Sequence, residues 1–103
     1  MDLSEKSRKA MEDLGLTSYE IKVYMSLLES GSMNAAEMSK KSSVPYSKIY
    51  DVLNSLEEKG WIESNSSRPQ KFFPKSPHTA IETTKMLIES RLKASENLVN
   101  AEL

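Results

Sequence analysis

Residues 34–74 constrain the fold of this chain more than any other stretch. Two segments with apolar residues at helical spacing are separated by a short turn at 43–45, and the second segment ends at Gly60. Two short segments with bulky apolar residues follow, with a polar turn between them. Helical periodicity predicts helices in the first half, and short apolar segments around a turn predict a hairpin in the second. The stretch therefore predicts helix, tight turn, helix, strand, turn and strand, in that order.

Capping signals place the starts of two helices. Thr17 and Asn34 are each followed three residues later by a glutamate, Glu20 or Glu37. In such a capping box the first side chain accepts a hydrogen bond from a free N–H group of the first turn, and the glutamate accepts one from the backbone of the capping residue. We expect a helix after each box, the first one ending at Gly31.

The helix after the turn should have one apolar side and one polar side. Pro45 suits its first turn because a helix leaves that N–H group unpaired in any case. The positions at helical spacing that we expect in the core are Ile49, Val52, Leu53 and Leu56. The positions then expected to face solvent are Tyr46, Ser47, Lys48, Asp51, Asn54 and Ser55, with Tyr50 at the margin.

Helices are also expected near both ends of the chain. Residues 3–14 are polar with sparse apolar positions and predict a short amphipathic helix ending at Gly15. Ser76 and Pro77 begin a last helix with two adjacent apolar stripes, which is more apolar surface than a lone surface helix needs. We therefore expect this helix to pair with a second copy of itself or to belong to a longer protein. The alternative is a helix packed back on its own domain.

Composition limits the kinds of function. Hydrophobic residues make up 38% and charged residues 28%, as in small globular domains, and the absence of cysteine excludes disulfides and thiolate metal sites. His78 is the one histidine and has no carboxylate at ligand spacing, so we expect no metal, no cofactor and no enzyme activity. No apolar run approaches the roughly 20 residues of a membrane span, so we expect a cytoplasmic protein without membrane contact.

The net charge is −1, but the charged residues are unevenly distributed along the chain. Residues 38–75 hold seven cations against four anions, a net charge of +3, so the rest of the chain carries −4. Contact with phosphates depends on this local charge rather than on the pI of the whole chain. The segment with the predicted turn and hairpin is therefore the part suited to a polyanion.

Together these elements predict a mainly α-helical winged helix-turn-helix with a small β-hairpin and an extra C-terminal helix that we expect to dimerise. Residues 1–76 would form a DNA-binding domain and residues 77–103 the dimerisation helix. In this fold the second helix of the motif enters the major groove. Residues 45–59 are the expected recognition helix, and residues 64–72 are the expected wing on the backbone or in the minor groove.

The candidate DNA-binding residues fall into two groups. Base edges are expected to meet one face of the recognition helix, at Tyr46, Ser47, Lys48, Tyr50 and Asn54. We expect Tyr46 either to stack on a sugar or to touch a thymine methyl group. Phosphates are expected to meet helix starts, a hydroxyl and basic side chains, at Asn34, Lys40, Lys41, Ser43, Pro45, Arg68 and Lys71.

A winged helix that docks on proteins is the competing interpretation, because the fold alone does not separate the two functions. DNA binding requires positive potential over residues 46–48 and over the hairpin at Arg68 together. A protein-docking version should expose a contiguous apolar patch there instead. The polar helix face and the basic hairpin favour a sequence-specific transcriptional regulator that binds double-stranded DNA.

Several runs of residues resemble one family. They are LGLTSYE at 14–20, VYMSLL at 23–28, VPYSKIYDVL at 44–53, LEEKGWI at 56–62 and RPQKFFP at 68–74. Through them the chain resembles the TrmB family of archaeal transcriptional regulators over residues 14–87. The first and third runs are fairly specific, whereas the LEEKGWI run is shared with many winged-helix regulators, including MarR-like ones.

The resemblance implies a winged-helix DNA-binding domain that dimerises through a helix after the wing. Two recognition helices would then lie about 34 Å apart on one face of the DNA, which predicts a palindromic operator. Many TrmB relatives bind sugars in a C-terminal domain. This sequence has no residues left for such a domain, so a sugar effector is not carried over.

Overall fold

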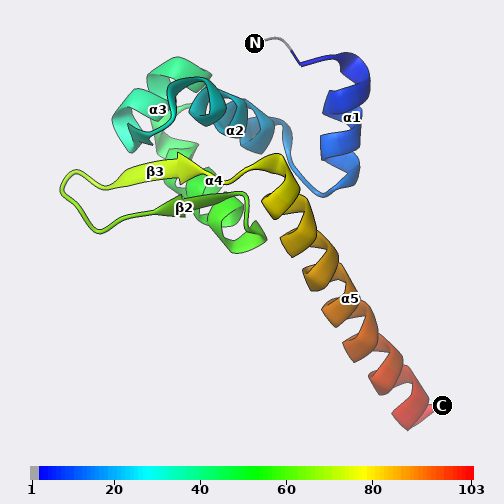
Figure 1. Cartoon of the computed structure of the whole chain (residues 1–103). Coiled ribbons are helices and arrows are strands. Elements are labelled where there is room, and N and C mark those ends of the chain that lie inside the picture. The colour runs from blue at the N-terminus through cyan, green and yellow to red at the C-terminus, as the bar shows by residue number, and fades with distance from the viewer. Residues whose placement is uncertain (1–2) are drawn as a thin grey trace.

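The computed structural model describes residues 3–103 and is shown in Figure 1. The predicted fold class is confirmed: the chain is mainly helical with a small antiparallel sheet, in the winged helix-turn-helix arrangement. The elements in chain order are α1 (Glu5–Asp13), α2 (Ser18–Ser30), β1 (Met33–Asn34), α3 (Ala35–Ser42), α4 (Tyr46–Lys59), β2 (Ile62–Ser64), β3 (Lys71–Pro74) and α5 (Pro77–Glu102).

Both predicted capping boxes are confirmed. At the start of α2 the Thr17 hydroxyl accepts a hydrogen bond from the Glu20 N–H at 3.2 Å, and the Thr17 N–H donates to Glu20 Oε1 at 2.7 Å. The same pair of bonds joins Asn34 and Glu37 at the start of α3, at 2.9 and 3.1 Å. Gly31 ends α2 with a φ of +85°, as its position after the apolar stripe predicts. Local sequence thus sets the starts of α2 and α3 and the end of α2.

The sheet has one strand more than the sequence predicts. β1 pairs with β3, and β3 pairs with β2, so the order is β1-β3-β2 with antiparallel neighbours. β1 is only two residues long, and Asn34 in it is also the N-cap of α3, so no alternation of apolar and polar residues could reveal it. Its pairing of Met33 with Phe72 and of Asn34 with Lys71 ties the wing to the start of α3.

The core lies between α2, α3, α4 and the sheet. Ile49, Leu53 and Leu56 of α4 are buried as predicted, whereas Val52 is only half-buried. Val44 is buried at the turn that precedes α4. Trp61 is buried directly after α4, with its ring edge-to-face against Tyr24 at a centroid distance of 5.1 Å. Other core residues include Ile21, Leu27, Met38 and Phe72.

Tyr24 fixes the chain between the wing and the last helix. Its hydroxyl donates a 2.7 Å hydrogen bond to the backbone carbonyl of Lys75, 51 residues away in sequence. Burial raises the pKa of Tyr24 to about 12, so the phenol stays protonated and donates at neutral pH. The bond satisfies a carbonyl where the chain leaves β3 for α5.

Only the first turns of α5 pack on the rest of the chain, and Figure 1 shows the helix projecting away from the other elements. Ala80 and Thr84 are buried and Ile81 is half-buried, whereas residues 85–103 are exposed. The alternative, a helix packed back on its own domain, therefore holds for the first turns of α5 but not for residues 85–103. The division into a domain at 1–76 and a helix at 77–103 stays a prediction.

Candidate nucleic-acid interface

Side-chain hydrogen bonds hold the turn between α3 and α4 and so set the direction in which α4 leaves it. Ser43 adopts the left-handed conformation with φ +62°, which turns the chain sharply after α3. The Ser39 hydroxyl donates to the Val44 carbonyl at 2.6 Å, and the Val44 N–H donates to the Ser42 hydroxyl at 3.3 Å. With both its backbone groups and its side chain held, Val44 fixes where the next helix starts.

Pro45 lies one position earlier in the helix than the sequence predicts. It is the N-cap of α4 rather than a residue of its first turn, with extended ψ of +138°. Among residues 3–103, no side chain caps the amino end of α4. The helix therefore begins with free N–H groups and a positive dipole end, the combination that attracts a phosphate.

The predicted polar face of α4 is exposed, with one exception. Tyr46, Ser47, Lys48 and Asn54 are all exposed. Ser55, predicted to face solvent with them, is half-buried and turned towards Glu20, whose pKa its hydroxyl helps to lower. Helical spacing alone could not show this, because the group that Ser55 meets is on another helix.

Two aromatic rings stand on this face. Tyr46 is 56% exposed and Tyr50 is 49% exposed, so Tyr50 lies on the open face rather than at its margin. Their rings meet edge to face at a centroid distance of 6.1 Å. The neighbouring Tyr46 hydroxyl raises the pKa of Tyr50, so this phenol is neutral at pH 7 and adds no negative charge to the face.

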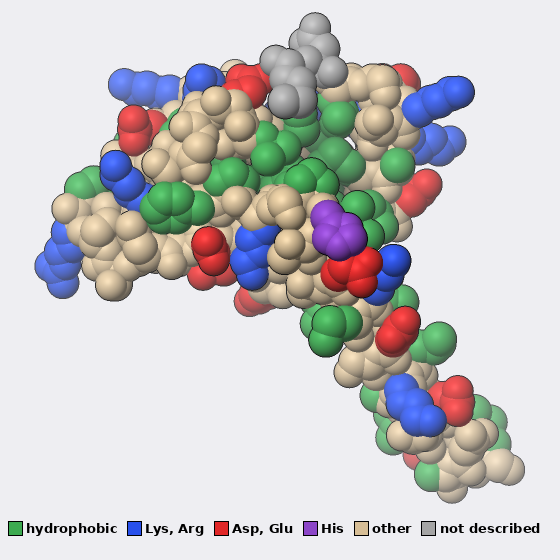
Figure 2. Space-filling view, viewed as in Figure 1, with side chains coloured by type: hydrophobic (Ala, Val, Ile, Leu, Met, Phe, Trp, Pro, Cys, Tyr) green, Lys and Arg blue, Asp and Glu red, His purple; other side chains and the backbone are tan. Residues whose placement is uncertain are grey.

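The remaining predicted residues lie on α3 and the wing. Asn34 is half-buried, and its side-chain oxygen already accepts a hydrogen bond in the cap of α3. Its side chain is therefore less available for contact with a phosphate. Lys40 and Lys41 lie in the last turn of α3, followed by exposed Ser43. Arg68 is exposed in the loop between β2 and β3, and Lys71 is exposed at the start of β3. In Figure 2 basic side chains mark the outer end of the wing.

A shallow hollow of about 140 Å³ shows that α3, α4 and the wing meet on one face. Its lining comes from the start of α3, from both exposed tyrosines of α4, and from the wing: Asn34, Ala35, Ala36, Tyr46, Tyr50, Pro69 and Gln70. The pairing of β1 with β3 brings these segments together. Asn34, predicted to meet a phosphate, and Tyr46 and Tyr50, predicted to meet bases, therefore line the same hollow.

A buried ion pair fixes the other end of α4, and the sequence pattern does not predict it. Lys59 Nζ lies 2.7 Å from Glu20 Oε1 and donates to the Gly15 carbonyl at 2.8 Å. The Glu20 side chain is 2% exposed and that of Lys59 is 35% exposed. Burial alone would raise the pKa of Glu20, but the Lys59 ammonium, the nearby Ser55 hydroxyl and the Thr17 N–H together outweigh it and lower that pKa.

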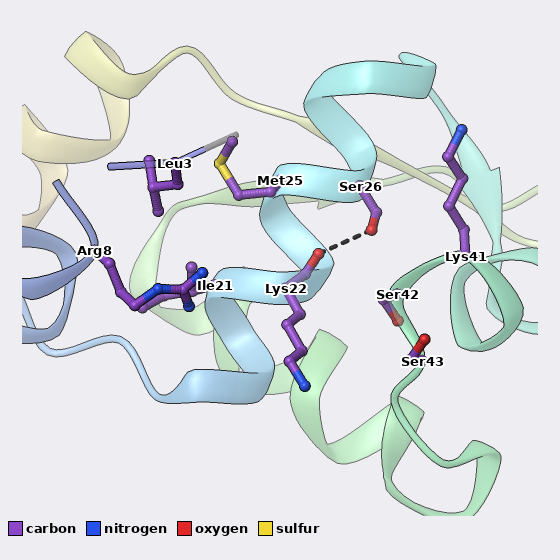
Figure 3. A pocket seen from close by; sticks show the side chains of 9 residues that line it. All are labelled: Leu3, Arg8, Ile21, Lys22, Met25, Ser26, Lys41, Ser42 and Ser43. Carbon is purple, nitrogen blue, oxygen red and sulfur yellow. Dashed lines mark hydrogen bonds between the residues drawn. The ribbon is translucent and has the colours of Figure 1, made fainter. Parts of the chain in front are cut away.

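A second, larger hollow of about 450 Å³ lies beside the turn that precedes α4. Figure 3 shows that Arg8, Lys22 and Lys41 reach it from three different helices. Their charged ends point to different sides in that view, and two lining hydroxyls are already used, Ser26 bonding the Lys22 carbonyl and Ser42 the Met38 carbonyl. The basic side chains of this hollow place positive charge near Ser43, but they do not converge on one point as in a defined anion site.

The family comparison identifies the chain. The family model described as "Sugar-specific transcriptional regulator TrmB" matches residues 11–78. The chain belongs to the TrmB family. The two residues of the Glu20–Lys59 pair belong to two of the runs that resemble the TrmB family. LGLTSYE ends at Glu20, and LEEKGWI contains Lys59. Within the TrmB fold these two runs therefore meet in space, which the sequence could not show.

Individual TrmB relatives agree with the family model. The chain is 35% identical over 80 residues to the HTH-type sugar sensing transcriptional regulator TrmBL1 of Pyrococcus furiosus, covering 78% of this chain and 24% of that protein. It is 33% identical over 96 residues to the DNA-binding HTH-type transcriptional repressor TrmBL2 of Thermococcus kodakarensis, covering 85% and 36%. The chain thus spans about a quarter to a third of the length of these curated relatives.

A solved structure supports the same placement. The structure of TrmBL2, described as an archaeal chromatin protein with a novel mode of DNA binding, superposes with a TM-score of 0.68 at 30% identity. The match covers 91% of this chain and 40% of that one.

Within residues 3–103, no helix is long and apolar enough to cross a membrane, and no group of three or more His, Asp and Glu side chains is placed to hold a metal ion.

Proposed function

We propose that this chain is a sequence-specific, double-stranded DNA-binding transcriptional regulator. The observation that supports this most directly is the exposed polar face of α4, which shares one surface with the wing while the opposite side of α4 fills the core. In this role α4 enters the major groove, and the loop of the wing contacts the backbone or the minor groove. Membership of a family of transcriptional regulators supports the same function, for which a cytoplasmic location is expected.

Each exposed group has a chemical role in such a complex. Ser47 and Lys48, in the first turn of α4, can hydrogen-bond acceptors on base edges. Asn54 lies two turns further along the same helix. The uncapped start of α4 at Pro45, with Ser43, Lys40 and Lys41 beside it, suits one phosphate strand, and Arg68 and Lys71 suit the strand that flanks the wing. Phosphate contacts set the position, and the few base contacts select the sequence.

The protein-docking alternative finds less support. A docking surface of that kind would expose a contiguous apolar patch over α4 and the wing. The exposed face of α4 carries Ser47, Lys48, Asp51 and Asn54, and its exposed apolar surface is limited to the two tyrosines. Selection of bound fragments from a random duplex pool tests the choice. Enrichment of one motif supports the proposal, whereas no enrichment above a bead control at low salt contradicts it.

Arg68→Ala tests the wing. We expect this variant to bind every DNA sequence more weakly and to lower the slope of log K against log salt by about 0.9, since one phosphate contact is lost. Titrations of one operator and one unrelated duplex at several salt concentrations measure both effects. Lys9→Ala, an exposed cation on α1, is the matched control and should leave the slope unchanged. An unaltered slope in Arg68→Ala would remove the wing from the interface.

We also propose that α5 pairs with the α5 of a second copy, giving a homodimer on a palindromic operator. At about 1.5 Å per residue, its 26 residues make a helix of about 39 Å, most of it unsupported by the rest of the chain. Its exposed apolar residues include Met86, Leu87, Ile88, Leu92, Leu98 and Val99. Residues 85–103 carry three cations and three anions, so net charge does not oppose pairing of two identical helices.

Leu92→Glu tests the dimer. Leu92 is 66% exposed in the single chain, so the substitution should leave the fold intact but place a charge in the paired face. We expect a dimer for the unaltered chain and a monomer for Leu92→Glu by light scattering at micromolar concentration. Ser90→Glu, at an exposed polar position on the same helix, is the control and should remain dimeric. A monomeric unaltered chain would refute this part of the proposal.

A further inference from the structure

The hollow between α3, α4 and the wing has an unusual lining for a surface that meets DNA. Tyr46 and Tyr50 stand one helical turn apart, at right angles to each other, and together with Ala35, Ala36 and Pro69 they form most of its lining. Both rings remain about half exposed. Polar and charged residues surround the hollow on α4 and on the wing, so it is a small apolar notch within a polar surface.

The position of the notch limits what can fill it. Tyr46 is the first residue of α4, the end of a recognition helix that lies nearest to base edges. The side of the major groove that faces such a helix is made of hydrogen-bonding groups and one methyl group, the C5-methyl of thymine. A methyl group is small enough for a shallow notch of about 140 Å³ and is the part of the duplex that gains from contact with ring edges, alanine and proline.

We propose that the Tyr46–Tyr50 notch is a specificity site that accepts the C5-methyl group of a thymine. The inference rests on the proposed DNA-binding function and deepens it, because it names the base that this part of α4 selects. The wing contributes Pro69 and Gln70 to the notch, so the hairpin takes part in base selection as well as in backbone contact. The register of β1 with β3 sets how far these wing residues lie from the two tyrosines.

Replacing thymine by deoxyuridine tests the proposal, because this exchange removes the methyl group and leaves every hydrogen-bonding atom in place. The probe is a duplex selected by the unaltered chain from a random pool, with each thymine replaced in turn. We expect binding to weaken about fourfold per half-site at one thymine, the effect of losing one buried methyl group, and to change little elsewhere. The double variant Tyr46→Ala/Tyr50→Ala should bind the thymine and deoxyuridine duplexes equally well.

Two further variants separate the effect of the rings from that of the hydroxyl and from that of exposed tyrosines elsewhere. Tyr46→Phe keeps the ring and removes the hydroxyl, so it should retain the preference for thymine. Tyr19→Ala removes an exposed tyrosine of α2 outside the notch and should leave the whole substitution profile unchanged.

Three outcomes would count against the inference. Equal binding of all deoxyuridine duplexes by the unaltered chain would overturn it while leaving the proposed function intact. The inference would also be overturned if Tyr46→Ala/Tyr50→Ala bound both duplexes more weakly by the same factor and so kept the preference for thymine. The rings would then contact sugars rather than the methyl group. Failure to select any DNA would refute the proposed function, and the inference with it.

Discussion

Lys59→Met is expected to lower the free energy of unfolding by about 2–4 kcal/mol at pH 7, because it leaves the buried carboxylate of Glu20 without its charged partner. Lys59 also bonds the Gly15 carbonyl, so the substitution releases the turn between α1 and α2 from the end of α4. The expected loss stays below that for a fully buried pair, since the Lys59 side chain is 35% exposed. Urea unfolding followed by circular dichroism measures the loss.

The pH dependence distinguishes loss of the ion pair from simple loss of packing. The folded-state pKa of Glu20 is lowered, so the ionised group stabilises the unaltered protein above about pH 4.5 and loses this effect as pH falls through the folded-state pKa. In Lys59→Met the lowering contribution of the ammonium is gone and burial raises the pKa of Glu20. The difference between the two proteins should therefore shrink as pH falls: first above pH 4.5, where Glu20 of Lys59→Met takes up a proton, and then below it, where Glu20 of the unaltered protein does. A difference that stays constant from pH 7 to pH 3.5 would contradict a role for the ion pair.

Glu20→Gln is the matched variant. Glutamine can keep the capping box with Thr17 but carries no charge, and the released Lys59 ammonium can move into water. We expect a smaller loss than for Lys59→Met, about 1–2 kcal/mol. In the double variant Glu20→Gln/Lys59→Met the total loss should be less than the sum of the two single losses, because no buried charge is then left unpaired.

The sequence predicts the parts of this fold that local chemistry determines. The caps at Thr17 and Asn34, the helix end at Gly60 and the buried side of α4 each depend on residues within a few positions of one another. The polar face of α4 follows from the same periodicity, so most candidate DNA-binding residues are correctly predicted to lie on an exposed surface. Whether they contact DNA stays a prediction.

Three features that the sequence does not predict depend on residues far apart in the chain. β1 is a strand only because Met33 pairs with Phe72, and two residues show no periodicity of their own. The ion pair joins Glu20 to Lys59 across 39 positions, and half-buried Ser55 lies close to the same glutamate. Glu20 already has a local role as the partner of Thr17, so its second role leaves no separate signal.

Local hydrogen bonds fix the start of α4, and distant contacts fix its end. The turn around Val44 sets its start, and its last turn is held by Lys59 and followed at once by buried Gly60 and Trp61. The first turns of α5 lie against the same end, since Gly60 packs on Thr83. Pairing of α5 with a second copy would therefore orient each recognition helix through a rigid contact rather than a flexible linker.

Gly60→Ala is expected to destabilise the protein by about 2–5 kcal/mol, from two causes. Gly60 has φ +88°, a conformation that costs a residue with a Cβ about 1–2 kcal/mol. A Cβ at this position would also lie 2.5 Å from Thr83 Cγ2 and 3.0 Å from Thr83 Cβ, so α5 or the end of α4 must shift, at a further cost of about 1–3 kcal/mol. Urea unfolding measures the total.

Two comparisons separate these causes. Gly15→Ala introduces a Cβ at φ +100° with nothing within 4 Å, so it should show the backbone cost alone. Thr83→Ser removes the Cγ2 atom that lies closest, so Gly60→Ala should cost less in that background than in the unaltered protein. If α5 shifts to relieve the contact, the two recognition helices of a dimer would change their spacing. Gly60→Ala should then weaken operator binding more than Gly15→Ala does, when the two variants are compared at equal folded fraction. Equal stability losses in Gly60→Ala and Gly15→Ala, with no effect of Thr83→Ser, would show that α5 does not press on the end of the recognition helix.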